Sequence, residues 1–335
     1  MRIGEADRTQ IESILGQSHA VWSDGLSLAD YVAFNLAQKD SDWGRERYRF
    51  LAGWGEDGAL LSSLKLFSLP GSLDGRPVRV AGIGAVFTPA GQRGKGYAAA
   101  LVEGALVQAR DSGHDLALLM SEIGGEYYAR LGFTALPAQE AACLVFLPVP
   151  WPKEPAWVAE GDPFAQVEGL RPYAEADRDA VIGLREIATA GQRFHLRRDR
   201  AAWDQALFKA TLGQGLRSDG PLRIWVVERR GAVRAYVVLK ESRAGLIWRE
   251  HGADAGDAAC LVDLFWAALA HARRRNLGRI DAWQLPDAIA EQRLYPVARR
   301  PLRDPVIMAR ALHPFRPLPG FKAPEECRLS WLDLF

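Results

Sequence analysis

The sequence has few of the residues that build disulfide frameworks and metal centres. Its 335 residues include 3 cysteines and 6 histidines, and the cysteines have no Cys-x-x-Cys spacing. An odd, sparse cysteine count is typical of a protein kept reduced in the cytoplasm rather than of a disulfide scaffold. Because the histidines are scattered, the sequence predicts no metal site.

Long apolar runs and an excess of one charge are also missing. No stretch approaches the ~20 apolar residues that span a membrane, and the N-terminus carries Glu5 and Asp7 instead of an apolar signal core. Lys+Arg number 42 and Asp+Glu 41, a net charge of +1, whereas nucleic-acid and membrane binders usually have a larger basic excess. The Arg-rich segments 194–200 and 271–279 are therefore interpreted as solvated surface. We expect a cytoplasmic protein with no nucleic-acid or membrane partner; its oligomeric state is not readable.

The most informative segment is a glycine-rich turn between an apolar strand and an amphipathic helix. Residues 86–98 read Val-Phe-Thr-Pro-Ala-Gly-Gln-Arg-Gly-Lys-Gly-Tyr-Ala, and apolar residues follow at helical spacing up to Ala109. Such a turn leaves unpaired backbone N–H groups at a helix N-terminus. These groups and the helix dipole together suit a pyrophosphate.

Two common phosphate-binding motifs do not fit this turn. The nucleotide P-loop needs Gly-Lys-Ser/Thr, but Gly94-Lys95 is followed by Gly96 and then Tyr97, so the Ser/Thr hydroxyl that binds magnesium is missing. The dinucleotide motif Gly-x-Gly-x-x-Gly fails because Ala99 occupies the last glycine position. The pattern that fits is Arg/Gln-x-x-Gly-x-Gly/Ala, at Arg93, Gly96 and Ala98. The structural alternative is an ordinary strand-to-helix turn with surface Arg and Lys side chains.

A second motif follows in the same order as in one known superfamily. Leu116–Met120 is an apolar run of strand length, and Tyr128 precedes Gly132-Phe133 by four residues. With the glycine turn, this resembles the GCN5-related N-acetyltransferases (GNAT) over about residues 45–147. Val-Phe-Thr-Pro, Arg-Gly-Lys-Gly-Tyr-Ala and Ser-Glu-Ile-Gly also resemble the fungal lysine N6-acetyltransferase group.

A proline-rich stretch divides the chain into two near-equal parts. Periodicity predicts helices and strands in the same order on both sides of it. We therefore expect an α/β (α+β) fold with two GNAT-like mixed-sheet domains in tandem, the second degenerate. The expected parts are a catalytic domain (1–147), a linker (148–166), a degenerate domain (167–312) and a tail that docks on the first domain (313–335).

Each half is expected to end on its own last strand, near Cys143–Leu147 and at Val306–Ala311, and residues 69–75 are expected to form a turn.

The second half has His251–Asp257 where the glycine turn should be, without the Arg-x-x-Gly-x-Gly/Ala pattern. Asp254 and Asp257 would repel a pyrophosphate there. We expect CoA to bind the first domain only. One intact and one degenerate copy resembles the architecture of enhanced-intracellular-survival-type acetyltransferases.

The GNAT resemblance implies acetyl-CoA as co-substrate, no metal, and a primary amine of a small molecule or lysine-like acceptor. The strand backbone near Val86–Thr88 would supply the oxyanion donor. Tyr128 would protonate the leaving thiolate, with a core tyrosine as the structural alternative. The expected CoA contacts are Val86, Phe87, Thr88, Arg93, Gly94, Lys95, Gly96, Tyr97 and Ala98.

The sequence offers two candidates for the general base. Glu122 ends the fifth strand, although it could equally cap the helix that follows. The other is the C-terminal carboxylate of Phe335, because survival-type enzymes are understood to use theirs. If the tail did not pack against the protein, its last residues would expose too much apolar surface. The alternative is that the tail simply packs on the second domain.

The acceptor pocket is the least determined part. Aromatic residues of the N-terminal segment, mostly expected in the core, could hold a cationic amine together with nearby aspartates. They are Trp22, Tyr31, Trp43, Tyr48 and Trp54, with Asp24, Asp40 and Asp42. The alternatives to an enzyme are an acyl-CoA sensor with the second domain as output module, or a scaffold of two relic folds.

Overall fold

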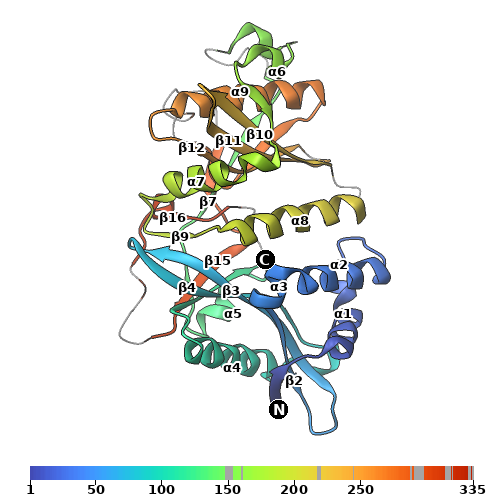
Figure 1. Ribbon diagram of the computed structural model, residues 1–335. Coiled ribbons are helices and arrows are strands. Elements are labelled where there is room, and N and C mark those ends of the chain that lie inside the picture. The colour runs from blue at the N-terminus through green and yellow to red at the C-terminus, as the bar shows by residue number, and fades with distance from the viewer. Residues whose placement is uncertain are drawn as a thin grey trace.

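Two mixed β-sheets, one above the other in Figure 1, make up the computed structural model, and helices cover both of them. The structure describes residues 1–147, 154–159, 161–216, 220–243, 245–286, 289, 298–313, 318, 320–330 and 333. Phe335, the apolar residues Trp331, Leu332 and Leu334, and the start of the predicted linker at 148–153 lie outside this description.

The main helices and strands follow the order that the periodicity predicts, and the structure adds several short elements. The first 147 residues form β1 (Arg2–Glu5), α1 (Arg8–Trp22), α2 (Leu28–Asp40), α3 (Asp42–Arg47), β2 (Tyr48–Trp54), β3 (Leu60–Leu73), β4 (Arg76–Phe87), α4 (Tyr97–Asp111), β5 (Leu116–Ser121), α5 (Glu126–Ala129), β6 (Thr134–Ala135) and β7 (Gln139–Leu144). The described remainder forms α6 (Pro163–Gln166), β8 (Leu170–Pro172), α7 (Arg178–Thr189), β9 (Phe194–Leu196), α8 (Arg200–Leu216), β10 (Leu222–Arg229), β11 (Ala232–Glu241), β12 (Leu246–Ala253), α9 (Ala258–Arg274), β13 (Arg279–Ala282), β14 (Ala298–Pro301), β15 (Val306–Ala311) and β16 (Cys327–Arg328). The added short elements include α3, β6, α6, β9, β14 and β16.

Local capping residues determine where the N-terminal helices begin. Asp7 accepts a hydrogen bond from the backbone N–H of Gln10, whose side chain accepts one from the N–H of Asp7, so the pair forms a capping box before α1. Ser27 and Ser41 cap α2 and α3 with their hydroxyls, which accept from the backbone N–H groups of Asp30 and Gly44. These three helices therefore start where the sequence supplies an acceptor for the free N–H groups.

The two sheets exchange strands near the end of each half. The first runs β1-β2-β3-β4-β5-β15-β6, and the second runs β14-β7-β13-β12-β11-β10-β8. The expected last strand of the first half, β7, pairs with β13 in the second sheet, where Cys143 faces Ile280. The expected last strand of the second half, β15, pairs with β5 in the first sheet, where Met308 faces Leu119. The assignment of each strand to its own half was therefore wrong, because an apolar strand pattern does not specify which sheet edge it completes.

The turn expected at residues 69–75 is shorter than predicted. Strand β3 continues through Pro70 to Leu73, and Asp74 and Gly75 alone make the turn, with φ values of 47° and 74°. Two adjacent residues with positive φ are the geometry of a tight hairpin turn, which Asp-Gly favours. The extended end of β3 pairs with β9, so residues 71–73 attach the second half of the chain to the first sheet.

The first sheet is buried on both faces by different parts of the chain. Helices α4 and α5 cover one face, with apolar residues such as Leu101 and Val102 against Leu64 and Leu66. Helices α1, α2 and α3 cover the other face, together with β9 and the described tail residues Cys327 and Leu329. Helix α8 lies between the two sheets and contacts α2 and α3 (Figure 1).

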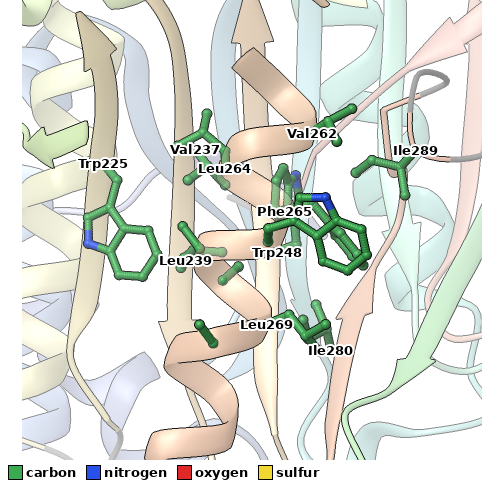
Figure 2. Close-up of a cluster of buried hydrophobic side chains, with 14 of the residues drawn as sticks. Trp225, Val237, Leu239, Trp248, Val262, Leu264, Phe265, Leu269, Ile280 and Ile289 are labelled. Atoms are coloured by element: carbon green, nitrogen blue, oxygen red, sulfur yellow. The ribbon is translucent and has the colours of Figure 1, made fainter. Parts of the chain in front are cut away.

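The second sheet has its own core, and α9 lies against it. Figure 2 shows Phe265, Leu264 and Leu269 of α9 beside Trp248 of β12 and Leu239 of β11. Val158 and Val167 also belong to this core, so the described end of the predicted linker region packs on the second sheet. No helix in the described part of the chain is long and apolar enough to cross a membrane.

Candidate active site

Strands β4 and β5 separate at the end where the glycine-rich turn begins. They pair in parallel from Val80 with Leu116 to Ile83 with Leu119, and no pair follows within these fully described strands. A bulge lies at the same level of β4, since the register against β3 shifts between Ser63 and Lys65. There Ala85 has a φ of 46°, which is uncommon for a residue other than glycine. The backbone of residues 84–87 therefore borders a wedge in the sheet.

The glycine-rich turn joins this wedge to the start of α4. Gly94 and Gly96 have φ values of 76° and 81°, which a side chain would strain. Gly96 is the N-cap of α4 but has no side chain to accept a hydrogen bond, and residues 93–96 are exposed. The N–H groups of the first helical turn are therefore available to an external anion. The predicted CoA-binding segment thus has the exposure and backbone geometry that a pyrophosphate requires.

Side chains around the turn hold it in place. The hydroxyl of the buried Ser62 donates to the carbonyl oxygen of Phe87 at 2.8 Å and lies 3.2 Å from the hydroxyl oxygen of Thr88. Arg93 donates to the Thr88 carbonyl oxygen at 3.2 Å, and Lys95 donates to the side chain of Gln92 at 3.0 Å. Arg93 and Lys95 add positive charge to this exposed turn.

Tyr128 lies on the α4 side of the sheet, in the short helix α5. Its ring packs edge-to-face against Tyr127 and Phe133, with centroids 5.0 and 6.0 Å away. Burial, with a smaller effect of Tyr127, raises the pKa of Tyr128 to about 12, so the phenol stays protonated at neutral pH. Among the described residues, none forms a hydrogen bond with its hydroxyl. The ring of Tyr128 thus packs in the core, and its phenol keeps a proton that it could donate.

Of the two candidate bases from the sequence, Glu122 lies among the described residues. Glu122 is exposed in the turn after β5, where Ser121 donates to the Gly124 carbonyl oxygen at 2.6 Å. Phe335 lies outside the described residues. Of the tail's last residues, Asp333 is described, and it binds Arg185 of α7 and Arg198. At Asp333 the tail is therefore attached to α7 and the segment after β9.

The aspartates expected beside the acceptor pocket have other partners. Asp40 binds Arg8 at 2.9 Å and Asp42 binds Arg45, both in exposed ion pairs. The aromatic residues near them are largely buried, as expected, and Tyr31 and Trp22 line a small cavity between α1, α2 and β3. The observed ion pairs of Asp40 and Asp42 give no support to a role in binding a cationic acceptor.

That cavity contains one residue that the sequence analysis missed. Lys65 of β3 lines it, together with Ser18, Tyr31, Ser63 and Ala85. Burial, and to a lesser extent Lys209, lowers the pKa of Lys65 to about 7. The alternation of β3 puts Leu64 and Leu66 on the α4 face and Lys65 on the opposite face, which is the signal that could have identified it.

The corresponding loop of the second half differs in charge. Arg234 of β11 binds Asp254 at 3.0 Å and lies 3.8 Å from Asp257, so the two aspartates flank the start of α9 with a cation between them. Among the described residues, no group of three or more His, Cys, Asp and Glu side chains could hold a metal ion.

Comparison with known proteins agrees with this arrangement. Residues 13–136 match the family model of the acetyltransferase (GNAT) domain, and no curated protein matches the chain. The fold is similar to a GCN5-related N-acetyltransferase from Kribbella flavida, with 17% identity, a TM-score of 0.64 and coverage of 93% of this chain and 72% of that one. A GCN5-related N-acetyltransferase from Anabaena variabilis has 15% identity and a TM-score of 0.68, with 93% and 73% covered.

A more distant likeness is to the N-myristoyltransferase of Saccharomyces cerevisiae, solved with bound myristoyl-CoA. It has 13% identity and a TM-score of 0.55, with 92% of this chain and 81% of that chain covered. At these identities the likeness is one of fold. Residues 13–136 match the GNAT-domain model, and the predicted mixed α/β fold with two sheets is confirmed. The narrower resemblances to fungal lysine N6-acetyltransferases and to survival-type enzymes stay predictions.

Proposed function

We propose that this protein is an acetyl-CoA-dependent N-acetyltransferase that acts on the primary amine of a small molecule or lysine-like acceptor. The observation that carries the proposal is the exposed glycine turn, which opens α4 at the point where β4 and β5 separate. An anion site beside a sheet wedge can hold the pyrophosphate and direct the rest of an acyl-CoA into the sheet. The GNAT-domain match over residues 13–136 supports acyl transfer as the reaction class.

In this proposal the chain contributes positioning, backbone donors and one phenol. The N–H groups of about Arg93–Ala98 bind the pyrophosphate. The backbone of β4 near Val86–Thr88, held by Ser62, stabilises the tetrahedral oxyanion. The acceptor nitrogen forms its bond to the thioester carbon as the C–S bond breaks. Tyr128 donates its proton to the departing thiolate, whose intrinsic pKa is ~8.5.

The decisive experiment is turnover with an amine library. Purified protein is mixed with acetyl-CoA and primary amines, free CoA is measured with a thiol reagent, and the acetylated product is identified by mass. We expect CoA release only when an amine is present. Binding of acetyl-CoA without release from any amine would instead indicate an acyl-CoA sensor. Myristoyl-CoA in parallel reactions would show whether a longer acyl group is used.

A further inference from the structure

Lys65 occupies an unusual place for a cation. Its Nζ lies 5.7 Å from the ring centroid of Tyr48 and 5.6 Å from that of Phe50. It donates one hydrogen bond, at 2.5 Å, to Oδ1 of the buried Asn35. The amide nitrogen of Asn35 in turn donates to the Tyr31 carbonyl oxygen at 2.8 Å, which fixes the oxygen toward Lys65.

The described surroundings of Lys65 offer a cation the ring faces of Tyr48 and Phe50 but no opposite charge. The titratable groups from the elements around it are Tyr48 of β2, Tyr31 of α2 and Lys209 of α8, while Asp24 acts on Tyr31. Within the described part of the chain, no carboxylate forms an ion pair with Lys65. Burial and the like charge of Lys209 both favour the neutral amine, and the pKa falls to about 7. The neutral amine is therefore favoured at Lys65 relative to a free lysine.

The position of Lys65 relates it directly to the wedge. Lys65 pairs with Gly84, the residue just before the bulge at Ala85, and both Lys65 and Ala85 line the cavity under α1 and α2. Tyr128 lies on the other face of the same sheet, with α4. A molecule in this cavity would thus meet β4 from the side opposite Tyr128.

We propose that Lys65 is the general base of the acyl transfer, and that the cavity between α1, α2 and β3 receives the amino group of the acceptor. This inference rests on the proposed function. The acceptor binds as the neutral amine, its nitrogen attacks the thioester carbon, and the new N–C bond leaves a positive charge on nitrogen. Lys65 Nζ takes that proton, the C–S bond breaks, and Tyr128 protonates the thiolate. Solvent afterwards removes the proton from Lys65 and restores that of Tyr128.

The same cavity explains why a cationic amine would lose its first proton. Two ammonium groups in a desolvated space repel each other, so Lys65 and an acceptor amine cannot both stay charged. Lys65 has a pKa of about 7, and a free alkylamine has a pKa of ~10 in water. The two amines together therefore bind fewer protons in this cavity than they would separately in water. The site therefore suits a small primary amine that carries no second cation.

The test compares Lys65→Met and Lys65→Arg with the wild type and with Lys322→Met, a change at an exposed lysine. We expect kcat to fall ~10²–10⁴-fold in both Lys65 variants, as for loss of a positioned base. The calorimetric Kd for acetyl-CoA should stay within about threefold, and the Lys322 variant should keep full activity. The wild-type kcat/KM should rise with pH through about 7, and this limb should vanish in both Lys65 variants.

An acceptor amine of low pKa distinguishes a base from a residue with a merely structural role. A structural defect would lower activity with all amines alike, whereas loss of a base matters less for an amine of low pKa. Hydroxylamine is neutral at pH 7 and needs less help from a base, so Lys65→Met should lose at least tenfold less activity with it than with an alkylamine. Unchanged kcat in Lys65→Met would overturn the proposal. So would a higher KM confined to acceptors with a carboxylate, which would make Lys65 an anion anchor. A wild type inactive with every amine would instead refute the proposed function itself.

Discussion

The carboxylate of Asp333 lies against the guanidinium of Arg198 in the protein interior, with 2.5 Å between Oδ1 and Nη2. Arg185 binds the same carboxylate at 3.0 Å, and both arginines also bind Glu250 of β12. All four side chains are nearly inaccessible to solvent. Because Ser330 also donates to Glu250, this cluster attaches the end of the chain to α7 and β12.

Loss of the Asp333 charge should destabilise the protein strongly. Asp333→Asn keeps the size of the side chain but leaves two buried arginines with one carboxylate between them. Removing one partner of a buried ion pair costs ~3–5 kcal/mol, and we expect a loss of this order in the free energy of unfolding in urea. The matched control is Asp179→Asn at the exposed pair with Arg200, where a change of ~0.5 kcal/mol or less is expected. Equal effects at both sites would contradict the buried cluster.

The same carboxylate should make stability depend on pH. Burial opposes ionisation of Asp333, but Arg185 and Arg198 outweigh it and hold its pKa below the usual value. A lowered folded pKa means that the stabilisation is present above the unfolded value of ~3.9 and is lost as pH falls through the folded value. Urea unfolding from pH 7 to pH 3 should show this acid loss in the wild type and a smaller loss in Asp333→Asn.

The glycine-rich turn before α4 should bind CoA, and the corresponding loop before α9 should not. Gly96→Asp forces a side chain onto a φ of 81° and sets a carboxylate beside the pyrophosphate site. Like charges ~4 Å apart near a surface repel by on the order of 4 kcal/mol, so calorimetry should find acetyl-CoA binding weakened more than tenfold. Gly256→Asp, in the exposed loop before α9, is the control and should leave binding unchanged. Two CoA sites per chain in the wild type would refute this prediction.

Tyr128→Phe should lower turnover and spare acetyl-CoA affinity. The phenylalanine ring preserves the packing against Phe133, while the proton donor for the thiolate is lost. A positioned acid typically contributes ~10²–10⁴-fold to rate. Tyr127→Phe removes a neighbouring hydroxyl on the same helix and is the control, with activity close to the wild type. If the two variants behave alike in a CoA-release assay, Tyr128 serves only in packing.

The strand exchange predicts that the halves depend on each other. A chain that ends at Leu147 lacks β15, so β5 has an open edge, and β7 has no partner. Unpaired strand edges promote association rather than a unique fold. We expect the fragment 1–147 to aggregate or to unfold without cooperativity in circular dichroism. Co-expression with residues 154–335 should restore a complex that copurifies. A monomeric, cooperatively folded 1–147 would show that the exchange is dispensable.

The sequence by itself determined the local elements and the glycine-rich turn. The bounds predicted for the strand Val306–Ala311 agree with those of β15. Glycines at positions 94 and 96 identified the turn because positive φ values are a local requirement. Hydrophobic periodicity and turn geometry depend on a few residues that are neighbours in the sequence, so they can be predicted without knowing the tertiary structure.

Tertiary structure decided which distant residues meet. Residues 194–200 were interpreted as solvated surface, yet Arg198 is buried beside Glu250 and Asp333, 52 and 135 positions away. Lys65 looks like any strand lysine until α1 and α2 cover it and the charge of Lys209 comes near, which together lower its pKa. β7 and β15 each complete the other half's sheet. Burial, pKa and strand partnership all depend on groups far away in the chain, which a local pattern does not encode.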